Sequence, residues 1–469
     1  MAPVTQSEDT ATRYAGYGWD VYKIDGHDLH EVLDVFEKAK AATTGKPQFI
    51  VAKTLIGKGI PEVCGTNKAH GEAGVKYVEA SRKAIGLPDE TFFVSPGDPH
   101  LFAKHIRKSS RLLMRNGNPH STRGEMPTGI LLRSSMRSFQ GRRPICLSVI
   151  PKFDPAANIA TRKAGSDVLQ PLAQAMPLVI SGSADLHGST LNYIKEGGDF
   201  NSKNREGRNL HFGIREHAMC GILNGLAYDG IFRPSGATFL IFSDYGRPSI
   251  RLASLSKLPV VYIFTHDSVG VGEDGPTHEP VETVAALRAI PGLDVIRPAD
   301  PEETAGAFAA AFQRTEGPTL LALTRQNLPT LNDIPVELRR EGVFKGGYVA
   351  KKESCRLGHY LARKRERASA RAESRRGARR PARESFQCLA SSALNARMPP
   401  TKESVLPNAV RRRVSRSRQV FPIRGFDLLV WTERTVSIDR FGMSAPGGKV
   451  MEALGMTSAK VVEAAQSRC

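Results

Sequence analysis

The stretch LPVVYIFTHDSVGVGEDGPTHEP, residues 258–280, decides the fold class of this chain. It opens with a short apolar run rich in β-branched and aromatic residues, which predicts a strand buried on both faces. Residues 265–280 then hold two His, four acidic residues and three Gly, a composition that no core helix would tolerate. Because parallel α/β sheets bind ligands at the carboxyl ends of their strands, we expect this loop to belong to a functional site.

Similar apolar runs lie on both sides of this stretch, separated by helical stretches such as PEETAGAFAAAFQRT (301–315). They are PLVISG (177–182), LDVIRPAD (293–300) and TLLALTRQ (319–326). The alternation predicts buried parallel strands with crossover helices, so the expected fold class is α/β. Polar or charged residues end the runs, namely Ser183, Asp185, His266, Asp267, Arg297 and Arg325. At any one strand, these polar residues either bind a ligand or begin a solvent-exposed loop, and both interpretations stay open.

The first 96 residues predict a smaller unit of the same class. VYKID (21–25) and QFIVAKTLIG (48–57) have strand-like patterns, and HEVLDVFEKAKAA (30–42) has the 3.6-residue spacing of a helix. Strand, helix and strand in this order predict a βαβ unit.

Length and composition exclude several classes of protein. At 469 residues and 40% hydrophobic residues, the chain is long enough for two to four folded domains. The longest uncharged apolar run, 258–264, is far shorter than the ~20 residues of a membrane helix, and residues 1–14 contain no apolar signal segment. The six cysteines have no metal-binding spacing, which indicates reduced thiols. We therefore expect a cytoplasmic protein without membrane association.

The net charge of +19 is concentrated in two stretches. Residues 355–420 hold 18 Lys and Arg against 4 Glu, and residues 97–150 hold 10 Lys and Arg against 2 acidic residues. Two interpretations compete: arms that neutralise nucleic-acid phosphates, or out-of-frame translation of a GC-rich gene. Aromatic residues for base stacking are nearly absent from 355–420, which favours the second interpretation and argues against a nucleic-acid partner.

Ten motifs outside the two basic stretches, taken in order, resemble transketolase. They are YGWDVYKIDGHD (17–28), KTLIGKG (53–59), GTNKAHG (65–71), IATRKAGSD (159–167), SGSADLHGS (181–189), HFGIREHAM (211–219), GATFLIFSDY (236–245), THDSVGVGEDGPTHEP (265–280), LTRQNLP (323–329) and SIDRFGMSAPGGKVMEALGMTSAKVVEAA (437–465). Several long motifs in one order are a far more specific signal than a single glycine-rich loop.

The resemblance implies a parallel-sheet, thiamine-diphosphate-binding fold with a C-terminal α/β domain, truncated at the N-terminus. Residues 1–96 would be the C-terminal remnant of the diphosphate-binding domain, and 151–354 the pyrimidine-binding domain. Residues 421–469 would be a remnant of the C-terminal domain. Between them lie an irregular basic linker (97–150) and an irregular Arg-rich segment (355–420).

The implied activity is transfer of a two-carbon ketol unit between phosphorylated ketose and aldose sugars by a homodimer. Its cofactors would be thiamine diphosphate and a divalent metal, magnesium or calcium. The family's metal-binding motif is missing from this chain, so no metal ligand is assigned. Asp25 and Asp28 of the IDGHD motif are not taken as substitutes. For the same reason we expect this fragment to be inactive alone.

The resemblance also assigns the cofactor site. Glu216 matches the glutamate that activates thiamine through its aminopyrimidine ring, and Phe239, Phe242 and Tyr245 match the aromatic pocket of that ring. By itself, Glu216 would be interpreted as a first-turn helix residue, and aromatics at every third position as core packing. His266 matches a residue that faces both cofactor and substrate.

The remaining assignments concern the sugar. The residues implied to line the sugar channel are His70, His266, Asp274 and His278. The residues implied to bind the sugar phosphate are Arg162, Ser189 and Arg325. Among these, His70 and His266 would lie nearest the reacting carbon as proton carriers, so Glu216, His266 and His70 form the expected catalytic set. Forked guanidinium groups suit a phosphate dianion.

Two alternatives of other classes stay open. One is a related thiamine enzyme, such as 1-deoxyxylulose-5-phosphate synthase or a two-oxoacid dehydrogenase subunit. The other is a catalytically dead scaffold that binds nucleic acid through the Arg-rich stretches. The phosphate-binding Arg162 and Arg325, together with the histidine-rich channel, favour transketolase over the related enzymes.

Overall fold

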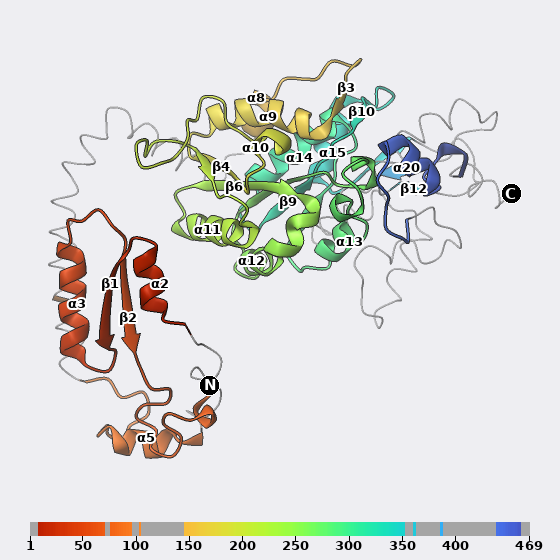
Figure 1. The fold of residues 1–469 in the computed structure, drawn as a ribbon. Coiled ribbons are helices and arrows are strands. Elements are labelled where there is room, and N and C mark those ends of the chain that lie inside the picture. Colours follow the sequence, from red (N-terminus) through yellow and green to blue (C-terminus); the bar gives the residue numbers. More distant parts are fainter. Residues whose placement is uncertain are drawn as a thin grey trace. The chain divides into compact units, whose positions relative to one another are not determined.

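A computed structural model describes the chain in parts that fall into two compact units, 1–120 and 121–469 (Figure 1). The described residues are 8–70, 76–95, 103–104, 145–351, 360–362, 385–387 and 438–460. Most of the basic stretches 97–150 and 355–420 lies outside them, as does 421–437. The predicted boundaries of those segments, and their out-of-frame origin, therefore stay predictions.

The first unit contains the predicted βαβ arrangement. Strand β1 (Asp20–Asp25) and strand β2 (Gln48–Lys53) pair in parallel, and helix α3 (Leu29–Ala41) connects them. Asp28 begins α3 because its carboxylate accepts the backbone N–H groups of His30 and Glu31. Three shorter elements complete the described part of the unit: α2 (Thr10–Gly16), η1 (Asn67–Ala69) and α5 (Val78–Ala84).

The second unit is built on a six-stranded parallel sheet with strand order β5-β4-β6-β7-β9-β8. Its strands are β4 (Val179–Ser183), β5 (Asn209–His211), β6 (Arg233–Phe239), β7 (Val261–Thr265), β8 (Asp294–Ile296) and β9 (Thr319–Ala322). The four apolar runs predicted as strands form β4, β7, β8 and β9, so the α/β prediction is confirmed for this unit. The sequence pattern did not predict β5 and β6.

Strand β6 is central to the sheet although its sequence, RPSGATF, lacks a strand-like pattern. All seven of its residues are buried. Gly236 allows helix α11 (Glu216–Asp229) to pack closely on this strand, because a β-carbon at Gly236 would lie 2.3 Å from Leu223 Cδ1. The strand is therefore selected by the space between its neighbours rather than by local propensity.

Helices cover both faces of this sheet (Figure 1). Side chains alternate along β7, with Val261 and Ile263 in one hydrophobic cluster and Tyr262 and Phe264 in the other. The first cluster includes residues of α9 (Thr161–Ala175) and α14 (Pro301–Gln313), and the second residues of α11 (Glu216–Asp229), α12 (Ser243–Leu255) and α13 (Thr283–Arg288). The sheet is thus buried on both faces, which leaves its edges and strand ends for ligands.

Shorter elements surround the sheet. They are α8 (Ile145–Val149), β3 (Asn158–Ala160), α10 (His187–Thr190), η2 (Leu240–Phe242), η3 (Val269–Val271), η4 (Pro276–His278), β10 (Asn327–Pro329), α15 (Val336–Phe344), β11 (Tyr348–Lys351), β12 (Tyr360–Ala362), β13 (Ser385–Gln387) and α20 (Gly447–Ala453). Strands β3 and β10 form an antiparallel pair, and β11, β13 and β12 form a separate three-stranded sheet.

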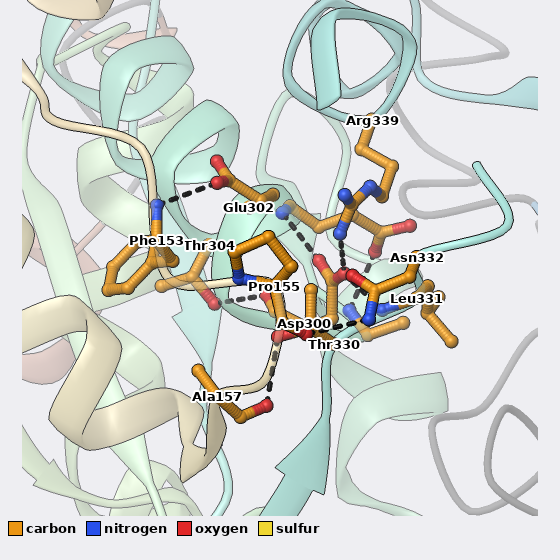
Figure 2. A network of polar contacts seen from close by, with 12 residues as sticks. Phe153, Pro155, Ala157, Asp300, Glu302, Thr304, Thr330, Leu331, Asn332 and Arg339 are labelled. Carbon is orange, nitrogen blue, oxygen red and sulfur yellow. Dashed lines mark hydrogen bonds and ion pairs between the residues drawn. The ribbon is translucent and has the colours of Figure 1, made fainter. Parts of the chain in front are cut away.

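A buried polar network holds the start of the second unit against α14 and α15 (Figure 2). Asp300 caps α14 by accepting the Glu303 N–H at 2.8 Å, and its other oxygen accepts the Leu331 N–H at 3.0 Å and pairs with Arg339. Glu302 accepts the Phe153 N–H at 2.8 Å and pairs with Arg340. Charged groups so deeply buried are stable only when paired and hydrogen-bonded.

Candidate active site

Aromatic rings stack at the carboxyl ends of the neighbouring strands β6 and β7. The ring centroids of Phe239 and His266 lie 3.6 Å apart with their planes at 27°. Phe242 stacks on Phe239 at 5.8 Å, and Tyr245 on Phe242 at 5.9 Å. His278 meets both phenylalanines edge-on, at 6.2 and 5.5 Å. The predicted pocket residues therefore lie together, and they belong to neither of the two hydrophobic clusters that cover the sheet.

His266 takes its place through an unusual backbone conformation. It directly follows β7 and has a φ of 58°, in the left-handed region that non-glycine residues rarely adopt. Its ring is 2% exposed, and Nδ1 lies 2.8 Å from Thr265 Oγ1. Strain of this kind is concentrated at functional sites, where the surroundings hold the residue in place.

Glu216 begins helix α11 and is 7% exposed. Helix α12 packs closely beside it, because a β-carbon at Gly246 would lie 3.6 Å from the Glu216 carbonyl oxygen and 2.8 Å from Cys220 Sγ. The backbone of Glu216 therefore lies near the end of α12 that carries Tyr245. Burial, with Glu216 nearby, raises the pKa of Cys220 to about 12, so this thiol stays neutral as a packing residue.

Two arginines come together from distant parts of the sequence. Arg162, at the start of α9, donates to the Ser189 carbonyl at 2.7 Å. Arg325, after β9, donates to the Val271 carbonyl at 3.4 Å. Burial lowers the pKa of Arg162, the charge of Arg325 lowers it further, and Asp274 opposes both. Two cations that act on each other electrostatically favour an anion nearby.

The structure gathers most of the predicted site residues but not all. Ten of the eleven lie in the second unit, whereas His70 follows η1 in the first. Tyr245 is 64% exposed, so it forms the outer edge of the aromatic stack. His187 hydrogen-bonds to Asn192 at 3.1 Å and to the Leu210 carbonyl at 3.2 Å, so both of its ring nitrogens have partners within this unit.

The ion pair between Arg297 and Asp267 was not predicted from the sequence. Arg297, after β8, donates to Asp267 at 2.7 Å, and both side chains are buried. Both residues were noted at strand ends, but their partnership depends on two loops whose approach only the sheet order reveals. This pair fixes the backbone next to His266.

The buried imidazole makes the protein's stability depend on pH. Burial lowers the pKa of His266 to about 3, and the charges of Arg162 and Arg325 add to this. Since the unfolded chain binds a proton near pH 6.5 and the folded chain does not, the contribution of His266 is complete above pH 6.5 and decreases as pH falls toward 3.

We therefore expect the free energy of unfolding to fall by at most about 2 kcal/mol through this residue between pH 7.5 and 5.0. Urea unfolding of the wild type and His266→Gln at both pH values measures the difference. The variant should lose less stability than the wild type. An equal loss in both proteins would show that His266 does not cause the pH dependence.

Comparison with known proteins now identifies the family. The profile "Transketolase, pyrimidine binding domain" matches residues 157–330, and "Transketolase, thiamine diphosphate binding domain" matches residues 2–114. A transketolase of Physarum polycephalum is 54% identical over 480 residues, covering 100% of this chain and 70% of the relative. The chain belongs to the transketolase family. The predicted family and enzyme class are confirmed, and the chain is partial relative to these proteins.

Solved transketolases have the same fold. The enzyme from Leishmania mexicana superposes with a TM-score of 0.85 at 31% identity, covering 99% of this chain and 68% of that one. The enzyme from Pichia stipitis in complex with sedoheptulose-7-phosphate has a TM-score of 0.84 at 29% identity, covering 100% of this chain and 69% of that one. The transketolase fold with its parallel sheet is thus established for this chain.

The residues present suit one half of the family's cofactor. A buried glutamate and a set of stacked aromatic rings are the residue types that can supply the hydrogen bond and the flat surfaces that an aminopyrimidine needs. Among the described residues, no group of three or more His, Cys, Asp or Glu side chains could hold a metal ion. The described part of the chain also contains no helix long and apolar enough to cross a membrane.

Proposed function

We propose that this transketolase-family protein transfers a two-carbon ketol unit from a phosphorylated ketose to a phosphorylated aldose. The observation that carries the proposal is the position of the Arg162 and Arg325 pair relative to His266. Both guanidinium groups lower the pKa of this buried histidine, which supports the proposal that the three side chains serve one site. A phosphorylated sugar has the matching ends, a dianion and a chain of hydroxyls.

Thiamine diphosphate, when bound, supplies an acidic carbon that breaks and forms the carbon–carbon bond of the ketol unit. Glu216 would hold the aminopyrimidine by a hydrogen bond and exchange a proton with it. Phe239, Phe242 and Tyr245 would bind its ring and exclude water. A divalent cation would accompany the diphosphate, and none of the residues named here is assigned as its ligand.

His266 would act on the sugar as a neutral base. Its low pKa keeps the ring uncharged at neutral pH, and Thr265 engages Nδ1, which leaves Nε2 for a substrate hydroxyl. His278 and Asp274 come from the same loop and would bind further hydroxyls. The assignment of His70 to the sugar channel stays a prediction from the motif resemblance.

The role proposed for Arg325 gives a specific prediction. Arg325→Ala should weaken binding of phosphorylated sugars by about 10-fold to 100-fold, because a charge-assisted hydrogen bond contributes about 1.5–3 kcal/mol. Unphosphorylated sugars should be much less affected. Michaelis constants, or dissociation constants by calorimetry, for both sugar types measure the effect, with the exposed Arg205→Ala as matched control. Equal losses on both sugar types would exclude a phosphate-binding role.

We also propose that the protein works as a homodimer. Helices α11 and α12 carry large apolar side chains with about half or more of their surface exposed in the single chain. They include Ile222 (49%), Tyr228 (67%), Leu252 (53%) and Leu255 (69%). Exposed large apolar side chains on two neighbouring helices are typical of subunit interfaces. Sedimentation of the purified chain tests this, and a monomer at micromolar concentration would contradict it.

The experiment that tests the activity is a ketol-transfer assay with thiamine diphosphate and magnesium. The expected absence of the first part of the diphosphate-binding domain, and the inactivity of the fragment alone, stay predictions. The assay therefore compares this chain with the chain joined to the corresponding region of a full-length relative. Ketol transfer by the joined protein would support the proposed function, and its absence in a folded, dimeric joined protein would contradict it.

A further inference from the structure

The loop that carries Asp274 and His278 packs against a segment nearly two hundred residues further along the chain. Ser444 Oγ donates to the Glu273 carbonyl at 2.7 Å. A β-carbon at Gly272, whose φ is 86°, would lie 2.8 Å from the Gly447 nitrogen. A β-carbon at Gly447 would lie 2.7 Å from the Gly270 carbonyl oxygen. The two backbones therefore touch without intervening side chains, and glycine permits this on both sides.

Glu279 ends this loop and turns inward. It follows η4 directly and is 2% exposed. A β-carbon at Gly442 would lie 1.6 Å from its Oε2 atom, so the carboxyl group lies flat against the Gly442 backbone. No φ in the left-handed region constrains Gly442. The position of the Glu279 carboxyl group is therefore what excludes a side chain there.

The chemistry of this carboxyl group differs from that of a surface glutamate. Burial raises the pKa of Glu279, and the nearby charge of Asp274 acts in the same direction. Neither carboxyl oxygen of Glu279 has a hydrogen-bond partner among the described residues. A glutamate is almost never fully buried unless it is paired. The Gly442 backbone is therefore the contact that defines the position of this carboxyl group.

We propose that Glu279 and Gly442 form a joint through which residues 440–447 hold the 272–279 loop in place, making Glu279 a positioning residue for Asp274 and His278. The segment near the C-terminus thereby helps to shape the sugar channel without touching substrate. This inference rests on the proposed role of Asp274 and His278 in binding sugar hydroxyls. Arg162 donates to the Ser189 carbonyl on other elements, whereas Arg325 donates to the Val271 carbonyl just before this loop.

The test compares Gly442→Ala with Gly448→Ala in the full chain. Gly448 has no atom within 4 Å of its β-carbon position, so the second variant adds a methyl group of the same size without a contact. Amide hydrogen exchange of residues 269–279 is measured by mass spectrometry. We expect the loop to exchange at least about 10-fold faster in Gly442→Ala than in the wild type, and at the wild-type rate in Gly448→Ala. The exchange of α9 and α14 should be unchanged in both variants. Unchanged exchange of the loop in Gly442→Ala would overturn the proposal.

Ligand binding distinguishes positioning from a general loss of structure. Gly442→Ala should weaken the binding of a phosphorylated ketose about 10-fold. Inorganic phosphate, which would not contact Asp274 or His278, should lose clearly less affinity. Equal weakening of both ligands would overturn the positioning role. If the wild type binds neither ligand, the proposed function fails, whereas the exchange measurement still decides whether the joint exists.

Shortening the glutamate gives an independent check. Glu279→Ala makes room for a methyl group at 442, so the double variant Gly442→Ala/Glu279→Ala should show less loop exchange than the sum of the two single effects predicts. Glu279→Gln keeps the shape of the side chain and should stay close to wild type. Strictly additive effects would show that the two residues do not act as a joint.

Discussion

Glu216→Gln is expected to lower ketol transfer by about 100-fold or more in the chain joined to the corresponding region of a full-length relative. The amide keeps the size of the side chain and one hydrogen bond to the aminopyrimidine, but it cannot take part in proton exchange. Because Glu216 is 7% exposed at the start of α11, water cannot easily replace the carboxyl group. Cofactor should therefore remain bound while the rate falls.

Steady-state kinetics gives the rate, and calorimetric titration gives the affinity for thiamine diphosphate. The exposed Glu196→Gln serves as matched control, since it makes the same chemical change outside the site. Near-normal turnover in Glu216→Gln would show that the activating role belongs to another residue. Loss of cofactor binding together with turnover would instead indicate that Glu216 mainly holds the ring.

Local sequence patterns predicted the strands that are apolar along their whole length. Strand β7 was recognised from VVYIF because both faces of it are buried in hydrophobic clusters. Strand β6 is equally buried but was not predicted, because Pro234 and Gly236 have low strand propensity. Gly236 is needed there because neighbouring side chains leave no room for a larger residue. Three-residue strands such as β5 are too short for any periodicity to be recognised.

The site shows the same division. The motif resemblance predicts which side chains belong to it, and ten of the eleven fall in one unit. It could not indicate that the His266 ring stacks on Phe239, because that contact depends on the left-handed backbone after β7. Glu279 escaped notice for a related reason. A glutamate in a loop looks solvated until the segment that covers it, residues 440–447, is known.

Arg339→Ala is expected to lower the free energy of unfolding by about 3–5 kcal/mol, the cost of leaving a buried charge without its partner. Arg339 is 2% exposed and pairs with Asp300, which is fully buried (Figure 2). Asp300 would keep its hydrogen bonds from the Glu303 and Leu331 amides, but these dipoles do not neutralise a full charge. Since Asp300 also caps α14, the loss should spread to the packing of this helix.

The matched control is Lys152→Ala, which breaks the exposed ion pair with Glu337 that forms at 2.7 Å on the surface of the same unit. It should cost less than about 1 kcal/mol, because water solvates both groups when they separate. Urea unfolding at pH 7.5 compares the two variants. The double variant Arg339→Met/Asp300→Asn should regain part of the loss, since it removes both charges and fills the space. If Arg339→Ala costs no more than Lys152→Ala, the buried pair does not stabilise this end of the sheet.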